Sequence, residues 1–362
     1  MKYSEDFLKD NILLEDMQGI YRSAEMWDSL TDSSIYVTGA SGMIASYLIM
    51  FLIYLNEVYE QRIEIYAGVR SIDKAYKRFG EYVEKEYFHL VQGDVCEPVN
   101  VEKPLDYIIH AASLASPQYY GRMPVETMMP NVIGTYELLK YAVENPIKGF
   151  LLFSSGSVYG SINGIESVDE TAVGGMDWLA PGNIYGESKR CGEAMCAAYF
   201  REFGVPVKIA RIHHTYGPTM DVRSDARVFA EFSNNILNGR NIVLKSDGKE
   251  RRAFCYLQDT VSGLFKIMLE GTEGECYNVG NPDAFISIRQ LAEILIGIFP
   301  EKNLTVEYQK RVGTGYCASP VKRQIPVSME KLNSLGWKAE VTVQDGFTRS
   351  LRYLAKEWGE NI

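Results

Sequence analysis

The stretch Ser34-Ile35-Tyr36-Val37-Thr38-Gly39-Ala40-Ser41-Gly42-Met43-Ile44-Ala45 decides the fold of this chain. Its first five residues predict a buried strand, and an apolar helix follows the glycine turn and runs to about residue 57. Strand, Gly-rich turn and helix form the context of a dinucleotide-binding fingerprint. Gly39 permits the tight turn, Gly42 lets the backbone approach a pyrophosphate, and Ala45 permits close packing of helix on strand. The amides at the helix start would then meet the phosphates. A glycine turn without a ligand is the alternative.

Strand-like and helical segments alternate from this stretch to residue 212. We expect further strands at 63–67, 88–92, 106–110, 150–154 and 207–212, with helices between them. This order predicts an α/β fold with a doubly wound parallel Rossmann sheet and right-handed crossovers. After about residue 217 the segments become shorter and mixed. A strand at 276–279 and helices at 287–299 and near 343–358 predict a smaller mixed α/β lobe.

The chain therefore divides into three predicted regions. Residues 1–33 form an N-terminal helical extension, residues 34–217 an NAD(P)-binding Rossmann domain, and residues 218–362 a substrate lobe interleaved with the first domain. Apolar side chains recur at helical spacing from Glu15 to Leu30, which predicts an amphipathic helix packed on the main domain. A position across the cofactor cleft is the alternative for this helix.

Composition narrows the classes of function. The 362 residues are 46% hydrophobic and 23% charged, as in ordinary globular proteins, and the net charge of −10 argues against nucleic-acid or membrane binding. The chain opens with a polar, acidic segment rather than a secretory signal, so we expect a cytoplasmic protein. Its six cysteines form no CxxC pair, and with four histidines this predicts no metal site.

Tyr185 and Lys189 are four residues apart, so they lie one helical turn from each other on the same face. A free tyrosine has a pKa near ~10 and is a poor base at neutral pH. A nearby ammonium stabilises the phenolate, so the phenol can exchange a proton with a substrate hydroxyl. Two neighbours on a surface helix would show the same spacing.

The ends of the second and third strands bear on the choice of cofactor. An NAD site usually has an acidic residue after the second strand, where this chain has Arg70. Arg70 could pair with a 2′-phosphate and so favours NADP over NAD. An exposed arginine without this role is the alternative. Asp94, after the third strand, is placed to reach an adenine amino group.

These motifs, taken in order, resemble the extended short-chain dehydrogenase/reductases of the NAD-dependent epimerase/dehydratase family, which act on nucleotide sugars. The resemblance runs from about Ile35 to Leu354. It is carried by Thr38–Ile44, Asp94-Val95, His110-Ala111-Ala112, Ser154-Ser155, Tyr185 with Lys189, Arg211 through Tyr216-Gly217-Pro218, Arg252–Asp259 and Asn278–Pro282. Locally, His110–Pro117, Lys249–Asp259 and Ser319–Arg323 are most similar to UDP-glucuronate decarboxylases.

The resemblance implies a set of site residues. Ser155, Tyr185 and Lys189 would be catalytic. The cofactor would bind Gly39, Ser41, Gly42, Met43, Ile44, Arg70, Asp94, Val95, Ala111, Ala112, Ser113, Asn131, Ser154, Tyr185, Lys189 and Ile212. The substrate, a nucleotide-diphosphate sugar, would bind Ser116, Ser157, His214, Arg227, Arg252 and Arg323. The three arginines suit phosphate oxygens, although surface ion pairs explain them equally well.

Two departures from the family pattern bear on the reaction. The decarboxylases and 4,6-dehydratases carry a carboxylate just after the fifth strand, where this chain has Ser155-Gly156-Ser157, an arrangement more similar to 4-epimerases. His214 stands where the family usually has an asparagine near the substrate phosphates. We therefore expect a nucleotide-sugar 4-epimerase that works by transient C4 oxidation.

Alternatives from the same group stay open. A net 4-ketoreductase would draw on NADPH, which Arg70 favours. Sequence similarity to the decarboxylases around Ser113–Pro117 favours a decarboxylase or 4,6-dehydratase. A non-catalytic dinucleotide-binding protein is the alternative outside enzymes. The family also implies a homodimer through the helices that contain Asn131 and Tyr185.

Overall fold

The computed structural model of the chain describes residues 6–162, 165–309 and 325–359. Its centre is a parallel sheet that contains seven strands among the described residues. In spatial order these are β10 (Cys276–Val279), β6 (Val207–Ile212), β5 (Gly149–Ser155), β4 (Tyr107–His110), β1 (Ser34–Thr38), β2 (Glu64–Val69) and β3 (Phe88–Gln92). The chain starts at the middle of this sheet and moves outward on both sides, which is the doubly wound order expected from the sequence.

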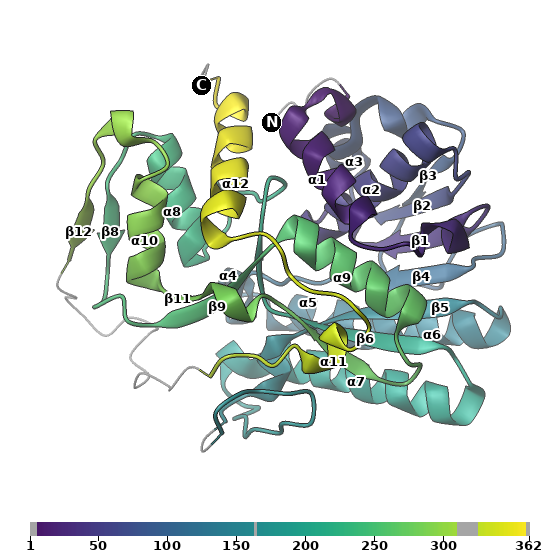
Figure 1. Cartoon of the computed structure of the whole chain (residues 1–362). Coiled ribbons are helices and arrows are strands. Elements are labelled where there is room, and N and C mark those ends of the chain that lie inside the picture. Colours follow the sequence, from purple (N-terminus) through teal and green to yellow (C-terminus); the bar gives the residue numbers. More distant parts are fainter. Residues whose placement is uncertain (1–5, 163–164, 310–324, 360–362) are drawn as a thin grey trace.

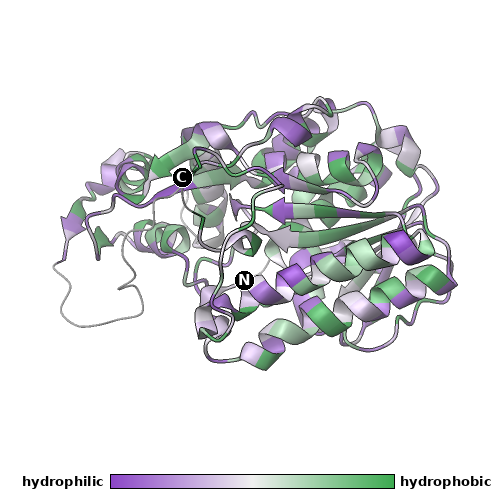
Figure 2. Cartoon of the chain, turned by 90° about the horizontal axis from the view of Figure 1, so that it is seen from below, coloured by the Kyte–Doolittle hydropathy of each residue, from purple (hydrophilic) through white to green (hydrophobic). Residues whose placement is uncertain are grey.

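Helices cover both faces of the sheet. In Figure 1, α1 (Asn11–Arg22), α2 (Met43–Tyr59) and α9 (Leu257–Glu270) lie on one face, and α6 (Thr135–Glu144) and α7 (Ile184–Phe203) on the other. Alternate strand residues face the two layers: Phe150 and Leu152 pack toward α6 and α7, whereas Leu151 and Phe153 join the opposite core. Figure 2 accordingly shows mainly green strands between helices with mixed purple and green surfaces.

Three shorter helices lie beside α2 or between β4 and α6. They are α3 (Ile72–Phe79), α4 (Pro117–Tyr120) and α5 (Pro124–Met129), and a π-helical turn at Pro130–Gly134 joins α5 to α6. The π-helical turn lies beside α7, on the helical layer that carries Tyr185. Unusual helical turns of this kind occur often at functional sites.

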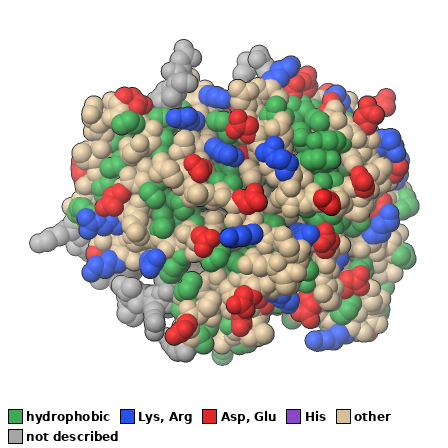
Figure 3. All heavy atoms as spheres, viewed as in Figure 1, with side chains coloured by type: hydrophobic (Ala, Val, Ile, Leu, Met, Phe, Trp, Pro, Cys, Tyr) green, Lys and Arg blue, Asp and Glu red, His purple; other side chains and the backbone are tan. Residues whose placement is uncertain are grey.

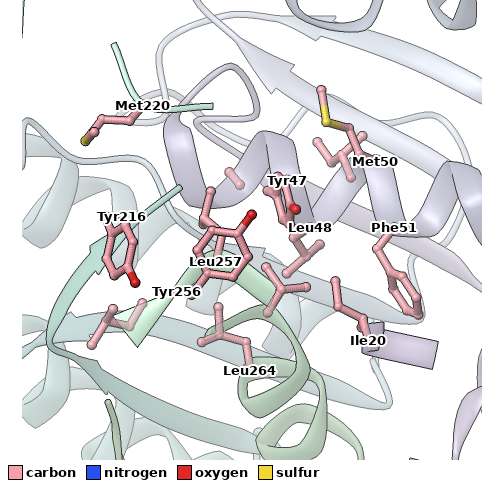
Figure 4. Packing of buried hydrophobic residues seen from close by; sticks show 14 of the residues in the cluster. Ile20, Tyr47, Leu48, Met50, Phe51, Tyr216, Met220, Tyr256, Leu257 and Leu264 are labelled. Atoms are coloured by element: carbon pink, nitrogen blue, oxygen red, sulfur yellow. The ribbon is translucent and has the colours of Figure 1, made fainter. Parts of the chain in front are cut away.

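Helix α2 is the centre of the larger core. All of its residues from Ala45 to Asn56 are buried, which explains why its sequence is apolar on every side. In Figure 4 its side chains Leu48 and Phe51 lie among residues from α1 and α9, including Ile20 and Leu264. The predicted helix after the glycine turn is thus confirmed, and all but its two ends are buried.

The N-terminal helix differs from the sequence prediction. One helix was expected from Glu15 to Leu30, but α1 spans Asn11–Arg22 and a separate 3₁₀ turn follows at Trp27–Leu30. Asp10 caps α1 because its carboxylate accepts the amides of Ile12 and Leu13. The indole of Trp27 donates to the carbonyl of Tyr21 at 2.7 Å, which turns the chain back after the helix ends.

Helix α1 packs on the rest of the molecule. The fully buried carboxylate of Asp16 accepts hydrogen bonds from Tyr47 and Tyr256, both at 2.5 Å, and from Arg349 at 2.6 Å. These partners come from α2, the end of β9 and α12 (Val343–Glu357). These hydrogen bonds hold the N-terminal extension against α2, β9 and α12.

The part after residue 217 contributes to two regions of the molecule. Strand β10 pairs with β6 in the central sheet, and α9 covers that sheet. The remaining elements after residue 217 are α8 (Val228–Leu237), β8 (Ile242–Leu244), β9 (Arg251–Tyr256), β11 (Phe285–Ser287), α10 (Ile288–Ile296), β12 (Val306–Tyr308), α11 (Glu330–Asn333) and α12. Strand β7 (His214–Tyr216), just before residue 217, joins them. They include a sheet of β11, β9 and β7 and a parallel pair of β12 and β8, at the left of Figure 1.

Charged side chains of both signs are interspersed over the face seen in Figure 3. Among the residues that the structure describes, no helix combines the length and apolar character needed to cross a bilayer.

Candidate active site

A cleft of about 300 Å³ opens at the carboxyl ends of the central strands. Its walls include Gly39, Ser41 and Gly42 after β1, Arg70 after β2, Asp94 and Val95 after β3, and Ala111, Ala112 and Ser113 after β4. The crevice outside the carboxyl ends of parallel strands is where open α/β sheets bind ligands. The structure thus brings together nine of the residues predicted to bind the cofactor.

The glycine turn has the geometry of a phosphate cradle. Gly39 has φ = +63°, and a Cβ there would lie 2.7 Å from the Cα of Ala112, so only glycine fits. Gly42 is the N-cap of α2, and no side chain caps the helix there. The first amides of α2 are therefore left to bind an anion, and the positive end of the helix dipole adds to the attraction.

Three buried polar atoms around the cleft also point to a ligand. The hydroxyls of Ser113 and Ser116 and the amide oxygen of Asn131 have no hydrogen-bond partner among the described residues. Leaving such an atom unsatisfied costs about 1–3 kcal/mol. The two serine hydroxyls suit the hydroxyl and phosphate groups of a nucleotide. The residues present therefore fit a bound dinucleotide.

The Tyr185–Lys189 pair lies beside the end of β5. Both side chains are buried, with 7% and 3% of their surface exposed, and the Lys189 ammonium lies 5.8 Å from the centre of the Tyr185 ring. Lys189 donates to the carbonyl of Phe153 at 2.5 Å. Ser155, two residues further along β5, hydrogen-bonds the Tyr185 phenol. The three predicted catalytic residues thus meet at one point.

Burial and charge act in opposite directions on this set. Burial raises the pKa of Tyr185 above its usual value, whereas Ser155 and the positive charge of Arg227 lower it. Burial lowers the pKa of Lys189 to about 7, and Glu193 opposes this effect. A lysine with such a pKa changes its charge near neutral pH, so its protonation can be coupled to that of the phenol.

Three of the predicted substrate residues, His214, Arg227 and Arg252, belong to β7, the start of α8 and β9. Arg227 contacts the Met43 sulfur at 4.0 Å and is within electrostatic reach of Tyr185. His214 is exposed at the start of β7, within electrostatic reach of Arg252 and Arg227. Both arginines also form ion pairs, Arg227 with Asp225 and Arg252 with Glu250. Arg323 lies outside the described residues.

Several predicted residues contact other parts of the protein. The Ser154 hydroxyl donates to Glu193 and is buried, whereas Ser157 is exposed and its amide donates to Ser155 at 3.2 Å. Asn131, in the π-helical turn, donates to Ser188 on α7 at 3.0 Å. Ile212 is buried at the end of β6, next to Ser155 in the sheet register.

Comparison with known proteins identifies the family of this chain. Residues 35–280 match the sequence model of the NAD-dependent epimerase/dehydratase family. The chain belongs to this family. Its members are enzymes that act on nucleotide sugars, as the sequence resemblance implied.

Related sequences include UDP-glucuronic acid decarboxylases. The chain is 30% identical to UDP-glucuronic acid decarboxylase 1 of Xenopus tropicalis over 325 residues, 89% of this chain and 72% of the relative. It is 31% identical to UDP-glucuronic acid decarboxylase 6 of Arabidopsis thaliana over 312 residues, 86% of each chain.

Similar solved structures confirm the fold. The UDP-glucuronic acid 4-epimerase of Bacillus cereus, solved with UDP-glucuronic acid and NAD, has a TM-score of 0.74 at 23% identity and covers 90% of this chain and 99% of its own. The UDP-glucose 4-epimerase of Thermotoga maritima, solved with UDP-glucose, has a TM-score of 0.76 at 22% identity with the same coverage. At this identity the likeness concerns the fold alone.

Sequence reasoning missed several residues of this epimerase/dehydratase site. Tyr120 stacks on Tyr185, and His213 lies so close to Gly156 that a Cβ on Gly156 would be 2.5 Å from the imidazole. Glu193 could have been found, because its spacing of four from Lys189 repeats that between Tyr185 and Lys189. The other two are brought to the site only by folding.

Proposed function

We propose that this epimerase/dehydratase is a nucleotide-sugar 4-epimerase. The observation that carries the proposal is the composition of the turn beside Tyr185. Its residues after β5 are Gly156, Ser157, Val158 and Tyr159, so the turn provides no carboxylate near the phenol. Inversion at C4 requires one acid/base at the 4-hydroxyl, whereas loss of water or of CO₂ usually draws on a further acid/base near the sugar.

The catalytic residues would act on the 4-hydroxyl of the sugar. The bound nicotinamide supplies a hydride acceptor and donor. Tyr185 takes the hydroxyl proton, and Ser155, which already hydrogen-bonds the phenol, holds the same oxygen and can relay the proton. Protonated Lys189 stabilises the phenolate. The 4-keto sugar then turns over in the site, and Tyr185 returns the proton to the oxygen of the inverted alcohol.

The substrate would span the two parts of the molecule. Arg227, beside Met43 at the start of α2, and Arg252, on β9, are our candidates for the diphosphate. To bind the diphosphate, each arginine would have to leave the carboxylate that it contacts in this structure or bind both at once. Arginine suits this task because its planar guanidinium binds phosphate oxygens in a bidentate manner.

A UDP-glucuronate decarboxylase is the second candidate, and the identity to the decarboxylases of Xenopus and Arabidopsis favours it. The structure provides His213 beside Gly156, at the turn where the sequence lacks a carboxylate. Its Nε2 lies 3.2 Å from the amide oxygen of Asn278, and burial lowers its pKa to about 4. The imidazole is therefore neutral at pH 7.

Product analysis distinguishes the two candidates. The purified protein is incubated with NAD⁺ and, separately, UDP-glucose, UDP-N-acetylglucosamine and UDP-glucuronic acid, and the products are identified by mass spectrometry and NMR. An epimerase yields a 4-epimer of unchanged mass. A product that has lost CO₂ or water overturns the proposal, as does a stoichiometric reduction of NAD⁺ to NADH.

A further inference from the structure

Glu193 extends the line of catalytic side chains along α7. It follows Lys189 by one helical turn, as Lys189 follows Tyr185, so the three lie on one helix face. Its carboxylate pairs with Arg211 of β6 in a bidentate manner, with 3.0 Å from Nε to Oε1 and 2.7 Å from Nη2 to Oε2. The two side chains are only 12% and 13% exposed. This is a buried ion pair one turn from the catalytic lysine.

Helix α7 holds the end of β5 through this carboxylate. The Ser154 hydroxyl donates to Oε1 of Glu193, and Lys189 donates to the carbonyl of Phe153 at 2.5 Å. These contacts fasten the two residues that immediately precede Ser155. Because Ser155 hydrogen-bonds Tyr185, the relative position of the two depends on how β5 is held against α7.

The charges around Lys189 indicate a second role for Glu193, which concerns the protonation of the lysine. Lys189 and Arg211 are two buried cations, and Glu193 is the carboxylate in contact with one and one turn from the other. The titratable groups that face this cluster are Tyr185 and Cys196 on α7, His110 on β4, Tyr159, Glu170 and His213 beside Arg211, and Cys276 on β10. Removal of the negative charge would leave two buried cations facing mostly neutral groups, which favours deprotonation of the lysine.

We propose that Glu193 is a positioning residue of the catalytic set, which fixes the end of β5 and keeps Lys189 protonated beside Tyr185. The inference rests on the proposed roles of Tyr185 and Lys189. It goes beyond them by assigning the protonation of Lys189 to an ion pair between α7 and β6 that does not need to touch the substrate.

Titration of Lys189 tests the proposal without turnover. The protein carries ¹³C at the lysine ε-carbons, and Lys189→Met assigns the resonance. We expect Glu193→Gln to lower the titration midpoint of Lys189 by about one pH unit or more. The alkaline limb of the kcat profile should move in the same direction. Glu202→Gln, an exposed position on the same helix, is the matched control and should change neither.

Further variants separate charge from position. Ser154→Ala retains the Glu193 carboxylate and should lower kcat without moving the titration midpoint of Lys189. Glu193→Asp also keeps a carboxylate, so the midpoint of Lys189 should stay close to its wild-type value. If Glu193→Gln does not fold, Arg211→Met provides the test, because an unpaired carboxylate should raise the midpoint. An unchanged midpoint in Glu193→Gln, or in Arg211→Met, overturns the proposal. Absence of 4-epimerase activity in the wild type refutes the proposed function and leaves the titration interpretable.

Discussion

The ring of Tyr120 lies parallel on the ring of Tyr185, with 4.8 Å between the ring centres and 4° between the planes. Tyr120 ends α4, in the loop that follows β4, and its hydroxyl donates to the carbonyl of Ala115 at 2.8 Å. One face of the Tyr185 ring is therefore covered by a segment that also carries Ser113 and Ser116. Gln118 of the same segment donates to the carbonyl of Ser224 in the C-terminal lobe at 3.0 Å. The segment that contains Gln118 and Tyr120 thus contacts both the C-terminal lobe and the Tyr185 ring.

Tyr120→Leu should lower kcat, because the stack holds the Tyr185 ring in one orientation. Aromatic pairs are worth about 0.5–1.5 kcal/mol beyond burial, which corresponds to roughly 2- to 10-fold in rate. Tyr120→Phe retains the ring and is the matched control in the same steady-state assay. Equal rates for Leu and wild type would contradict this role of the stack.

Tyr185→Phe should abolish most of the activity and leave cofactor affinity unchanged. The phenol is the proposed acid/base, and such groups contribute roughly 100- to 10,000-fold. Initial rates with the sugar nucleotide and NAD binding by calorimetry are the two measurements. Full activity in the variant would exclude the assigned role, and a wild type that binds NAD without any turnover would support the non-catalytic alternative.

Arg70→Ser should weaken NADPH binding selectively if the guanidinium holds a 2′-phosphate. Loss of one charge-assisted hydrogen bond costs about 1.5–3 kcal/mol, or roughly 10- to 100-fold in Kd. Lys74, which also lines the cleft, provides the control variant Lys74→Ser. Equal changes for NADPH and NADH would show that Arg70 does not select the cofactor, and NAD would then be the cofactor expected from the family.

Acid should destabilise the protein through His110. Its imidazole is buried between the Thr38 hydroxyl at 2.9 Å and the Pro130 carbonyl at 3.1 Å, and burial, with the charge of Lys189, lowers its pKa to about 3. Between pH 6.5 and 3 the unfolded chain binds a proton that the folded protein excludes, so stability falls as pH falls. From pH 6.5 to 5 the loss is about 2 kcal/mol.

His110→Gln should remove this part of the pH dependence. Denaturant unfolding at pH 6.5 and pH 5 measures it, and the variant should lose about 2 kcal/mol less than the wild type over that interval. His213→Phe serves as a comparison, because the pKa of His213 is also lowered, to about 4. An identical loss in His110→Gln and wild type would show that His110 does not carry the effect.

The homodimer implied by the family can be tested on an exposed apolar surface. Val125, Met128 and Met129 of α5 and Tyr136 and Val143 of α6 are between 39% and 64% exposed. These helices contact α7, so this surface adjoins the helices through which we expect the chain to pair. Val125→Glu should convert a dimer into a monomer in light scattering at micromolar concentration. Val58→Glu, an exposed position on α2, is the control.

The sequence predicted the elements that depend on local pattern. Strand β3 and helix α7 lie where the alternation and the Tyr–Lys spacing placed them, because a buried parallel strand and a long helix have strong periodicity of their own. The predicted extent of α1 was wrong, because the apolar spacing continues through residues 23–26 although the helix ends at Arg22. That end depends on the contact between Trp27 and Tyr21, which the spacing does not contain.

The sequence by itself determined the family and the parallel sheet, because both rest on motifs and periodicities that can be read along the chain. The same motifs predict the glycine cradle and propose Ser155, Tyr185 and Lys189 as the catalytic residues. Only the tertiary structure decided what stands around them. Tyr120 on Tyr185, Glu193 between Ser154 and Arg211, and His213 against Gly156 join segments separated by up to 65 residues. Such contacts follow from how strands and helices pack, and this packing sets the burial and charge that determine the pKa values of the site.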